Sequence, residues 1–436
     1  MASDKSRKTR KEQPFDAAQA FSVGYSESHL FFNTGTFKMT RQYFAPLEPR
    51  PDDPILGLVE LYKNDPRETK VNLGVGVYLN NDGALPLMKA VGAAEQRLAE
   101  RGAPHGYIPM SGMPGYCAAI QKLVFGAASE AVLSGRIATI QSLGGTGALR
   151  LGAVFAHEYL GLTKAVVSNP TWGNHITLFE HAGLKVDRYP YLNKDKNGVD
   201  FEAMKACLKG LDAGTVVLLH ACCHNPTGYD LNGEQWAEVT KIVQERDLLP
   251  FLDIAYQGFG SGLDEDAAAV RALCAAGISF LVSSSCSKNF GLYGERAGGL
   301  HIVTPNAGEA KVVTSIIKAI VRAEYSNPAT HGAAIVNEVL NDEELRASWE
   351  EEVTGMRTRI RSMRESLTAA GEALGADLSF AVRQAGMFSF TGLNAEQMLA
   401  LREKYGVYGV ANGRICIAGL NTENVTYVAE ALAGVR

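Results

Sequence analysis

One lysine, Lys288, follows an apolar run and has small hydroxylic residues beside it. It lies in Ser-Ser-Ser-Cys-Ser-Lys-Asn-Phe-Gly-Leu-Tyr-Gly-Glu-Arg, residues 283–296. A lysine amine whose pKa is lowered can form a Schiff base with a carbonyl compound. Ser285 and Ser287 offer hydroxyls and Arg296 a guanidinium fork, which together suit a phosphate. By itself, the segment fits a strand-end turn with solvated charges equally well.

A glycine-rich stretch supplies a second feature suited to anions. Residues 141–150 read Gln-Ser-Leu-Gly-Gly-Thr-Gly-Ala-Leu-Arg and lead into a helical pattern. Free backbone N–H groups and the positive end of a helix dipole meet at such a point. The stretch lacks the Gly-Lys-Ser/Thr of a P-loop and fits the dinucleotide fingerprint poorly. It therefore indicates an anion site without identifying the anion.

These residues follow short apolar runs that alternate with amphipathic stretches. We expect strands at residues 165–168, 215–220, 249–253 and 280–283, and helices at 233–243 and 264–276. This alternation predicts a mostly parallel sheet covered by helices on both faces. Ligands bind such sheets at the carboxyl ends of the strands. His220, Asp253 and Lys288 follow the apolar runs, so we expect them at that edge.

Composition narrows the class of protein. The 436 residues are 46% hydrophobic with a net charge of −5, which supports a large core and gives no electrostatic reason for a nucleic-acid partner. The seven cysteines show no zinc spacing, so we expect no metal site and a reducing, cytoplasmic location. No apolar run is long enough to span a membrane, so we expect no membrane partner.

Four segments are predicted along the chain. Residues 1–52 form an extension with a basic cluster and no periodicity, disordered at its start; a nucleic-acid arm, a transit peptide or a misassigned start are the alternatives. Residues 53–85 begin a small domain, residues 86–337 form a large domain, and residues 338–436 complete the small one. The last segment opens with a long charged helix from about Glu338.

The segment around Lys288 resembles the cofactor-lysine signature of class I aminotransferases, the aspartate and aromatic amino-acid family. Further segments resemble that family in the same order, at residues 72–78, 168–175, 220–228, 253–259, 322–328 and 412–414. The likeness covers the chain from Asp53 onward and looks nearest to bacterial aromatic (tyrosine) aminotransferases. It implies an α/β protein of pyridoxal-phosphate (PLP) fold type I, with a seven-stranded, mostly parallel sheet in the large domain and a smaller α/β domain.

The resemblance assigns PLP as the cofactor and gives each contact a residue. Lys288 would hold PLP and shuttle a proton, and Asp253 would pair with the ring nitrogen. Tyr256 and Asn225 would donate to the 3-oxygen, and Trp172 would stack on the ring. His175 and His220 would lie beneath the ring and orient the carboxylate. The phosphate contacts implied are Gly145, Thr146, Ser285, Ser287, Arg296 and, from a neighbouring subunit, Tyr107.

The substrates implied are amino acids and 2-oxo acids, bound by two arginines. Arg414 would grip the α-carboxylate, close to the backbone of Gly76 and the side chains of Trp172 and Asn225. Arg322 would reach a distal carboxylate from the other subunit of a homodimer with shared active sites. An arginine fork suits a carboxylate better than a lysine does.

The preferred amino acid depends on the mouth of the pocket. Leu79, Leu85 and Gly106 stand where aspartate-directed relatives tend to be more polar, whereas Thr146 and Asn327 look like the aspartate type. Apolar mouth residues lower the cost of desolvating a phenyl ring. We therefore favour a broad aromatic aminotransferase over an aspartate aminotransferase. A PLP lyase or decarboxylase on the same fold, or a non-enzymatic protein that acts through the basic head, are the rival classes.

Overall fold

The computed structural model describes residues 44, 47–49 and 55–436 of the chain. The basic cluster and the expected disorder near the N-terminus lie outside these residues. The chain divides into two units, residues 1–51 and 52–436, and the architecture below is that of the second unit. Its division into a large and a small domain at residues 85/86 and 337/338 stays a prediction.

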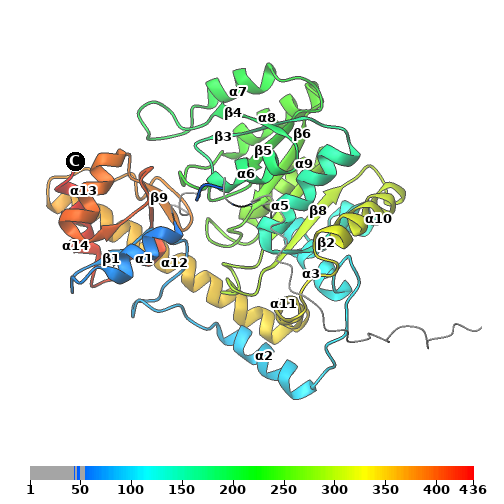
Figure 1. Ribbon diagram of the computed structural model, residues 1–436, viewed down its shortest axis with the longest axis horizontal. Helices are drawn as coiled ribbons and strands as arrows, with labels where there is room; N and C mark the ends of the chain where they lie inside the picture. Colours follow the sequence, from blue (N-terminus) through cyan, green and yellow to red (C-terminus); the bar gives the residue numbers. More distant parts are fainter. Residues whose placement is uncertain (1–43, 45–46, 50–54) are drawn as a thin grey trace, which may run out of the picture. The chain divides into compact units, whose positions relative to one another are not determined.

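A seven-stranded sheet dominates this unit (Figure 1). In spatial order its strands are β2 (Ile137–Leu143), β8 (Ala297–Val303), β7 (Phe280–Ser285), β6 (Leu249–Ile254), β5 (Val216–His220), β3 (Lys164–Asn169) and β4 (Lys185–Pro190). Strand β8 runs antiparallel to both of its neighbours, and the other pairs are parallel. The prediction of a seven-stranded, mostly parallel sheet is therefore confirmed.

Both faces of the sheet are buried, because successive side chains of a strand point to opposite faces. In β5, Val216 and Leu218 belong to one apolar cluster, whereas Val217 and Leu219 belong to the other. The first cluster includes residues of α5 (Gly144–Val154), α6 (Gly173–His181) and α10 (Ala307–Glu324). The second includes residues of α2 (Lys89–Arg101), α3 (Pro114–Phe125), α4 (Glu130–Leu133), α7 (Phe201–Lys209), α8 (Gly233–Glu245), α9 (Ala268–Ala275) and α11 (His331–Asn341). Continuous apolar strands such as β5 need this cover on both sides.

The register brings the polar ends of three strands together. His220 of β5 lies opposite Asp253 of β6, and Asp253 lies opposite Ser283 of β7. The three residues come from segments that are well separated in sequence, yet they are neighbours across the sheet. The expected cluster at the carboxyl edge is therefore present.

The long charged helix begins later than predicted. Helix α11 ends at Asn341, and α12 runs over Glu343–Ala373, so Glu338 belongs to α11. Asp342 breaks the two helices because its Oδ1 accepts a hydrogen bond from Leu345 N at 2.9 Å, an N-cap that stops the helix from continuing backward. Amphipathic periodicity alone does not reveal such a cap between two adjacent helices.

Helix α12 runs from α2 and α11 toward α14 and two small sheets (Figure 1). One sheet pairs β9 (Phe388–Phe390) with β11 (Arg414–Cys416), and the other pairs β1 (Val71–Asn72) with β10 (Val407–Tyr408). The helices of this region are α1 (Leu56–Asn64), α13 (Ala395–Tyr405) and α14 (Val425–Ala433). Among the described residues, no helix is both long and apolar enough to cross a lipid bilayer.

Candidate active site

A cavity of about 240 Å³ lies at the carboxyl edge of the sheet. Its lining residues are Ile55, Gly76, Gly145, Thr146, Leu149, Trp172, Asn225, Asp253, Ala255, Tyr256, Ser285, Ser287, Lys288, Tyr293, Arg296, Phe388 and Arg414. It is lined by all of the predicted catalytic, cofactor-binding and substrate-binding residues except Tyr107, Arg322 and the two histidines expected beneath the ring, His175 and His220. The residues expected at the mouth do not line it either: Leu79, Leu85, Gly106 and Asn327. Segments that are hundreds of residues apart in the chain therefore form one enclosed space.

Lys288 follows β7 and presents its amine to this cavity. Its Nζ lies 4.5 Å from the centre of the Tyr256 ring. Burial lowers the pKa of Lys288 to about 8, and the positive charges of Arg296 and Arg414 act in the same direction, while Asp253 opposes them. An amine with this pKa is partly neutral at physiological pH, as a nucleophile or a proton acceptor must be.

The carboxylate of Asp253 points one oxygen at a histidine and leaves the other unpaired. His175 Nε2 lies 3.2 Å from Asp253 Oδ2, and its Nδ1 lies 2.9 Å from Thr171 Oγ1. Burial would raise the pKa of Asp253, but the hydrogen bond and charge of His175, together with Lys288, bring it below the ordinary value. Oδ1 is buried and has no partner among the described residues. A buried carboxylate oxygen of this kind suits a cationic N–H donor from a ligand.

His220 stands behind this pair. Its ring lies 5.2 Å from that of His175, and its Nδ1 accepts a hydrogen bond from Asn225 N at 3.2 Å. Burial lowers the pKa of His220 to about 3, with the neighbouring His175 adding to the effect. The ring is therefore neutral at physiological pH and free to accept this bond.

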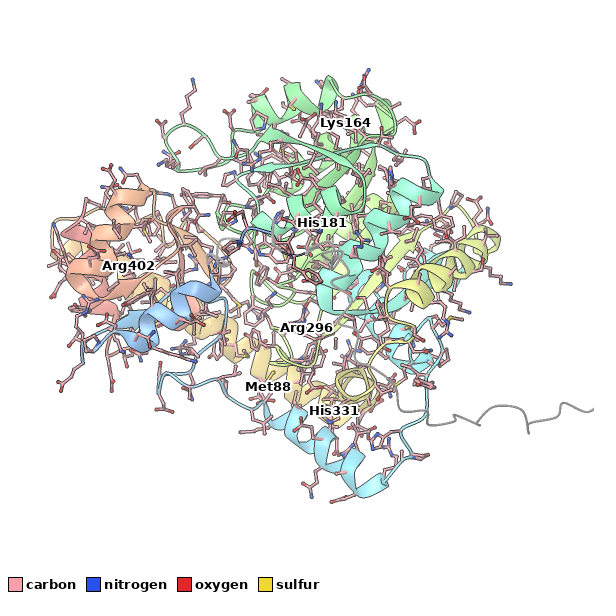
Figure 2. The ribbon with its side chains drawn as sticks, viewed as in Figure 1. Met88, Lys164, His181, Arg296, His331 and Arg402 are labelled. Atoms are coloured by element: carbon pink, nitrogen blue, oxygen red, sulfur yellow. The ribbon has the colours of Figure 1, made fainter. Side chains whose placement is uncertain are left out.

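The glycine-rich turn and the lysine loop together make an anion cradle. Gly144 has a φ of +65°, and a Cβ there would come within 2.5 Å of Arg296 Nη2, so a side chain would displace the guanidinium. Arg296 Nη1 donates to Ser287 Oγ at 3.2 Å, and Ser287 N donates to Ser285 Oγ at 3.2 Å. Figure 2 labels Arg296 between the sheet and α12. Helix α5 begins at Gly144, so its N-terminal N–H groups face the same space.

A buried arginine, Arg414, closes the other side of the cavity. It is 4% exposed and donates to Gly74 O at 2.8 Å and to Asn225 Oδ1 at 3.2 Å. Its guanidinium carbon lies 4.2 Å from the centre of the Phe388 ring. A Cβ on Gly76 would meet the same ring at 2.6 Å, so only glycine fits there without moving it.

Two predicted residues lie elsewhere in the single chain. Tyr107 is 96% exposed, and Arg322 is exposed in the last turn of α10, where it donates to Ser326 Oγ. Both were predicted to act from a neighbouring subunit, so their assignment stays a prediction.

Other lining residues were not foreseen as site residues. Tyr293 lies within the lysine motif, and its hydroxyl accepts a hydrogen bond from Tyr78 N at 2.9 Å, a role that the motif itself could have suggested. Phe388 had been assigned only to a strand. Ile55, Leu149 and Ala255 carry no polar group that would mark them in a sequence.

This combination of a reactive lysine, a paired carboxylate, an anion cradle and a buried arginine is that of a PLP-dependent enzyme. The family model of aminotransferase class I and II matches residues 68–432. The chain belongs to this family, and it is a PLP-dependent aminotransferase.

The chain is about equally similar to relatives that carry two different names. The chain is 50% identical over 397 residues to the aromatic-amino-acid aminotransferase of Escherichia coli, covering 90% of this chain and 100% of that protein. It is 49% identical over 394 residues to the aspartate aminotransferase of Pseudomonas aeruginosa, covering 90% and 99%. The crystal structure of an aromatic-amino-acid aminotransferase from Burkholderia pseudomallei, covalently bound to PLP, superposes with a TM-score of 0.89 at 52% identity, covering 91% and 100%.

The residues of the cavity fit PLP by their own chemistry. The unpartnered Oδ1 of Asp253 matches a protonated ring nitrogen, and the Arg296 cradle matches a phosphate. The amine of Lys288 opens into the same cavity as both. The aldehyde, the ring nitrogen and the phosphate of PLP thus each have a complementary group in the cavity, namely Lys288, Asp253 and Arg296.

Proposed function

We propose that this enzyme exchanges amino groups between aromatic or dicarboxylic L-amino acids and 2-oxoglutarate. The observation that carries the proposal is the convergence of Lys288, Asp253 and Arg414 on one cavity. The arginine provides a carboxylate site within the same space as the reactive amine. A lyase or decarboxylase needs no second carboxylate site, so the distal arginine, Arg322, favours transamination.

PLP, when bound, supplies an electron sink for the negative charge that develops at the substrate Cα. Lys288 would hold the cofactor, and its free amine would carry a proton to and from the substrate Cα. Asp253 keeps the ring nitrogen protonated, and its hydrogen bond with His175 fixes the carboxylate. Tyr256 and Asn225, 3.5 Å apart through Nδ2 and the hydroxyl, donate to the 3-oxygen.

Other residues position the cofactor. Trp172 covers one face of the ring. The phosphate is held by Gly145, Thr146, Ser285, Ser287 and Arg296. Tyr107, which is 96% exposed in one chain, completes this site from the partner of a homodimer. A tyrosine in such an interface can bury its ring and still use its hydroxyl as a hydrogen-bond donor.

The distal arginine sorts substrates by charge. In our proposal Arg322 of the partner subunit faces the side-chain carboxylate of aspartate or glutamate, and Arg414 grips the α-carboxylate. Arg322→Leu should lower kcat/KM for aspartate and glutamate by roughly two to three orders of magnitude, because a buried charge pair is worth about 2–5 kcal/mol. Phenylalanine should lose little, since it brings no charge to that site. Arg414→Leu should lower kcat/KM for all amino acids alike; steady-state kinetics with each substrate measures both variants.

The same variants test the shared site. Mixed dimers of Arg322→Leu and Lys288→Ala subunits contain one site with both residues intact. We expect them to regain activity toward aspartate that neither parent shows. Equal losses for aspartate and phenylalanine in Arg322→Leu would refute the distal role, and mixed dimers without activity would refute the sharing of sites.

Aspartate aminotransferase activity is the second candidate function, supported by the near-equal identities to relatives of both names. Thr146 lines the cavity as in the aspartate type, whereas the aromatic ring of Phe388 offers an apolar surface for a substrate ring. Single-turnover rates for aspartate, glutamate, tyrosine and phenylalanine on one preparation decide between them. An aspartate rate that exceeds both aromatic rates by two orders of magnitude or more would favour the second candidate, because pocket contacts discriminate by only a few kcal/mol.

The pKa of Lys288 predicts a pH dependence of cofactor capture. Only the neutral amine attacks the aldehyde, and burial lowers the pKa of Lys288 to about 8. The rate at which the apoenzyme takes up PLP should rise about tenfold per pH unit up to that pH and level off above it. Stopped-flow absorbance over this range measures the rate. A profile that keeps rising to the ordinary lysine pKa, about 10.4, would show that the site does not lower it.

A further inference from the structure

A second polar cavity, of about 440 Å³, borders the long helix α12. It shares no lining residue with the active site. Its walls come from the loop at residues 259–261, from α12, and from the segment at residues 382–386. Three arginines of α12 line it, at positions 357, 361 and 364. Spacings of four and three residues place the three side chains on one face of the helix.

Arg364 carries a buried charge that no carboxylate pairs with. It is 4% exposed, and no ion pair involving it occurs among the described residues. Its guanidinium donates to the carbonyls of Ala381, Gly386 and Phe388 and to Ser389 Oγ at 2.6–2.7 Å. The Nε is buried without a partner in the described structure. Burial lowers the pKa of Arg364 to about 10, which reflects this incomplete compensation.

The other two arginines add charge that is not neutralised. Arg357 donates to Gly258 O at 2.9 Å and to Thr354 Oγ1 at 3.3 Å, so it also lacks a carboxylate. Arg361 makes no hydrogen bond or ion pair with any described residue. Arg346 of the same helix differs, because its Nε pairs with Glu350 Oε1 at 2.9 Å. Three guanidinium groups thus face one cavity without an anionic partner.

Acidic groups near the cavity do not cancel this charge. Glu365 lines the cavity and is exposed, but it forms no ion pair within the described part of the chain. Asp266 is buried and accepts hydrogen bonds from Gly258 N, Gly260 N and Ser261 N at 2.8–2.9 Å, so it fixes the loop that forms one wall. Asp230, which is exposed, accepts the N–H groups of residues 223 and 224 at 2.7–2.8 Å.

We propose that this cavity is a second anion site that binds a small, multiply charged oxyanion of the phosphate class. Guanidinium forks match phosphate oxygens in geometry and charge. Three guanidinium side chains line this cavity. Arg364 sets the charge of the buried wall, and Arg357 and Arg361 supply free N–H donors at the mouth. The bound anion bridges α12 to the loop that follows β6 and to the turn segment that leads into β9.

Isothermal titration calorimetry of the PLP-loaded enzyme with inorganic phosphate tests the site. We expect saturable binding in the millimolar range or below. Arg361→Gln combined with Arg357→Gln should weaken it at least about tenfold while kcat/KM for transamination is retained. Arg357 and Arg361 are both at least partly exposed, so the fold should tolerate their substitution better than a substitution of Arg364. Glu365→Gln should strengthen binding, because it removes the negative charge that competes with the ligand.

Controls separate this site from the active site. Arg346→Gln lies on the same helix outside the cavity and should leave phosphate affinity unchanged. Arg414→Leu removes the active-site arginine and should also leave it unchanged. No saturable binding, equal affinity in the Arg357/Arg361 double variant, or loss of binding only in Arg414→Leu would each overturn the proposal.

Discussion

Lys288→Ala should abolish transamination, with a loss of at least about four orders of magnitude in the single-turnover rate. In our proposal the amine has two roles, as the attachment point of PLP and as the proton carrier. Proton transfer by a positioned group alone contributes about two to four orders of magnitude. The variant should also lack the visible absorption band of lysine-bound PLP. Stopped-flow absorbance with excess amino acid measures both effects in one experiment.

A lysine at the far end of the sheet provides the control. Lys164 begins β3, at the edge opposite the active site, and its Nζ lies 3.8–3.9 Å from Asp187 and Asp212 (Figure 2). Lys164→Ala should keep the absorption band and the rate, because a surface ion pair contributes little. A Lys288→Ala enzyme with near wild-type turnover would remove the lysine from the chemistry.

Asp253→Asn should lower kcat/KM by about two to four orders of magnitude and should lower the stability of the apoenzyme far less. In our proposal the carboxylate faces the cationic ring nitrogen of bound PLP, and breaking a buried pair costs about 3–5 kcal/mol. In the apoenzyme Oδ1 has no partner, and the amide oxygen of asparagine can still accept a hydrogen bond from His175 Nε2, so the variant loses only the attraction of the neighbouring charges. Kinetics with PLP bound, and the thermal midpoint of the apoenzyme, measure the two effects.

Asp266→Asn should instead lower the stability of the protein and leave its turnover nearly unchanged. Its carboxylate accepts three backbone N–H groups of the loop at residues 258–261, and an amide nitrogen would face one of these donors. We expect the free energy of unfolding to fall by about 1–3 kcal/mol while kcat changes far less. If Asp253→Asn instead lost stability and kept its rate of proton abstraction, its carboxylate would be a structural group.

Local sequence was sufficient for the parts of the site that lie in one continuous segment. The lysine loop carries Ser285, Ser287, Lys288 and Arg296 within a few residues, and a turn of that length can only present them to one point. Apolar runs with helical spacers likewise predicted the parallel sheet, because both faces of such strands must be buried. The order of the strands in the sheet was not predictable from these runs.

Tertiary structure decided the contacts between distant segments. Arg414 reaches Gly74 O across 340 residues, and Phe388 packs against both Arg414 and Gly76. No periodicity encodes such pairs, because they depend on how the small sheets dock.

The cavity along α12 also depends on how separate elements pack together. A run of arginines on one helix is typical of a solvated face. Only the loop after β6 and the segment before β9 supply the other walls that make it a cavity. Sequence therefore determined which groups can react, since chemistry resides in residue types and short spacings. The fold decided which of them share a cavity, since burial and charge compensation arise only when separate elements pack together.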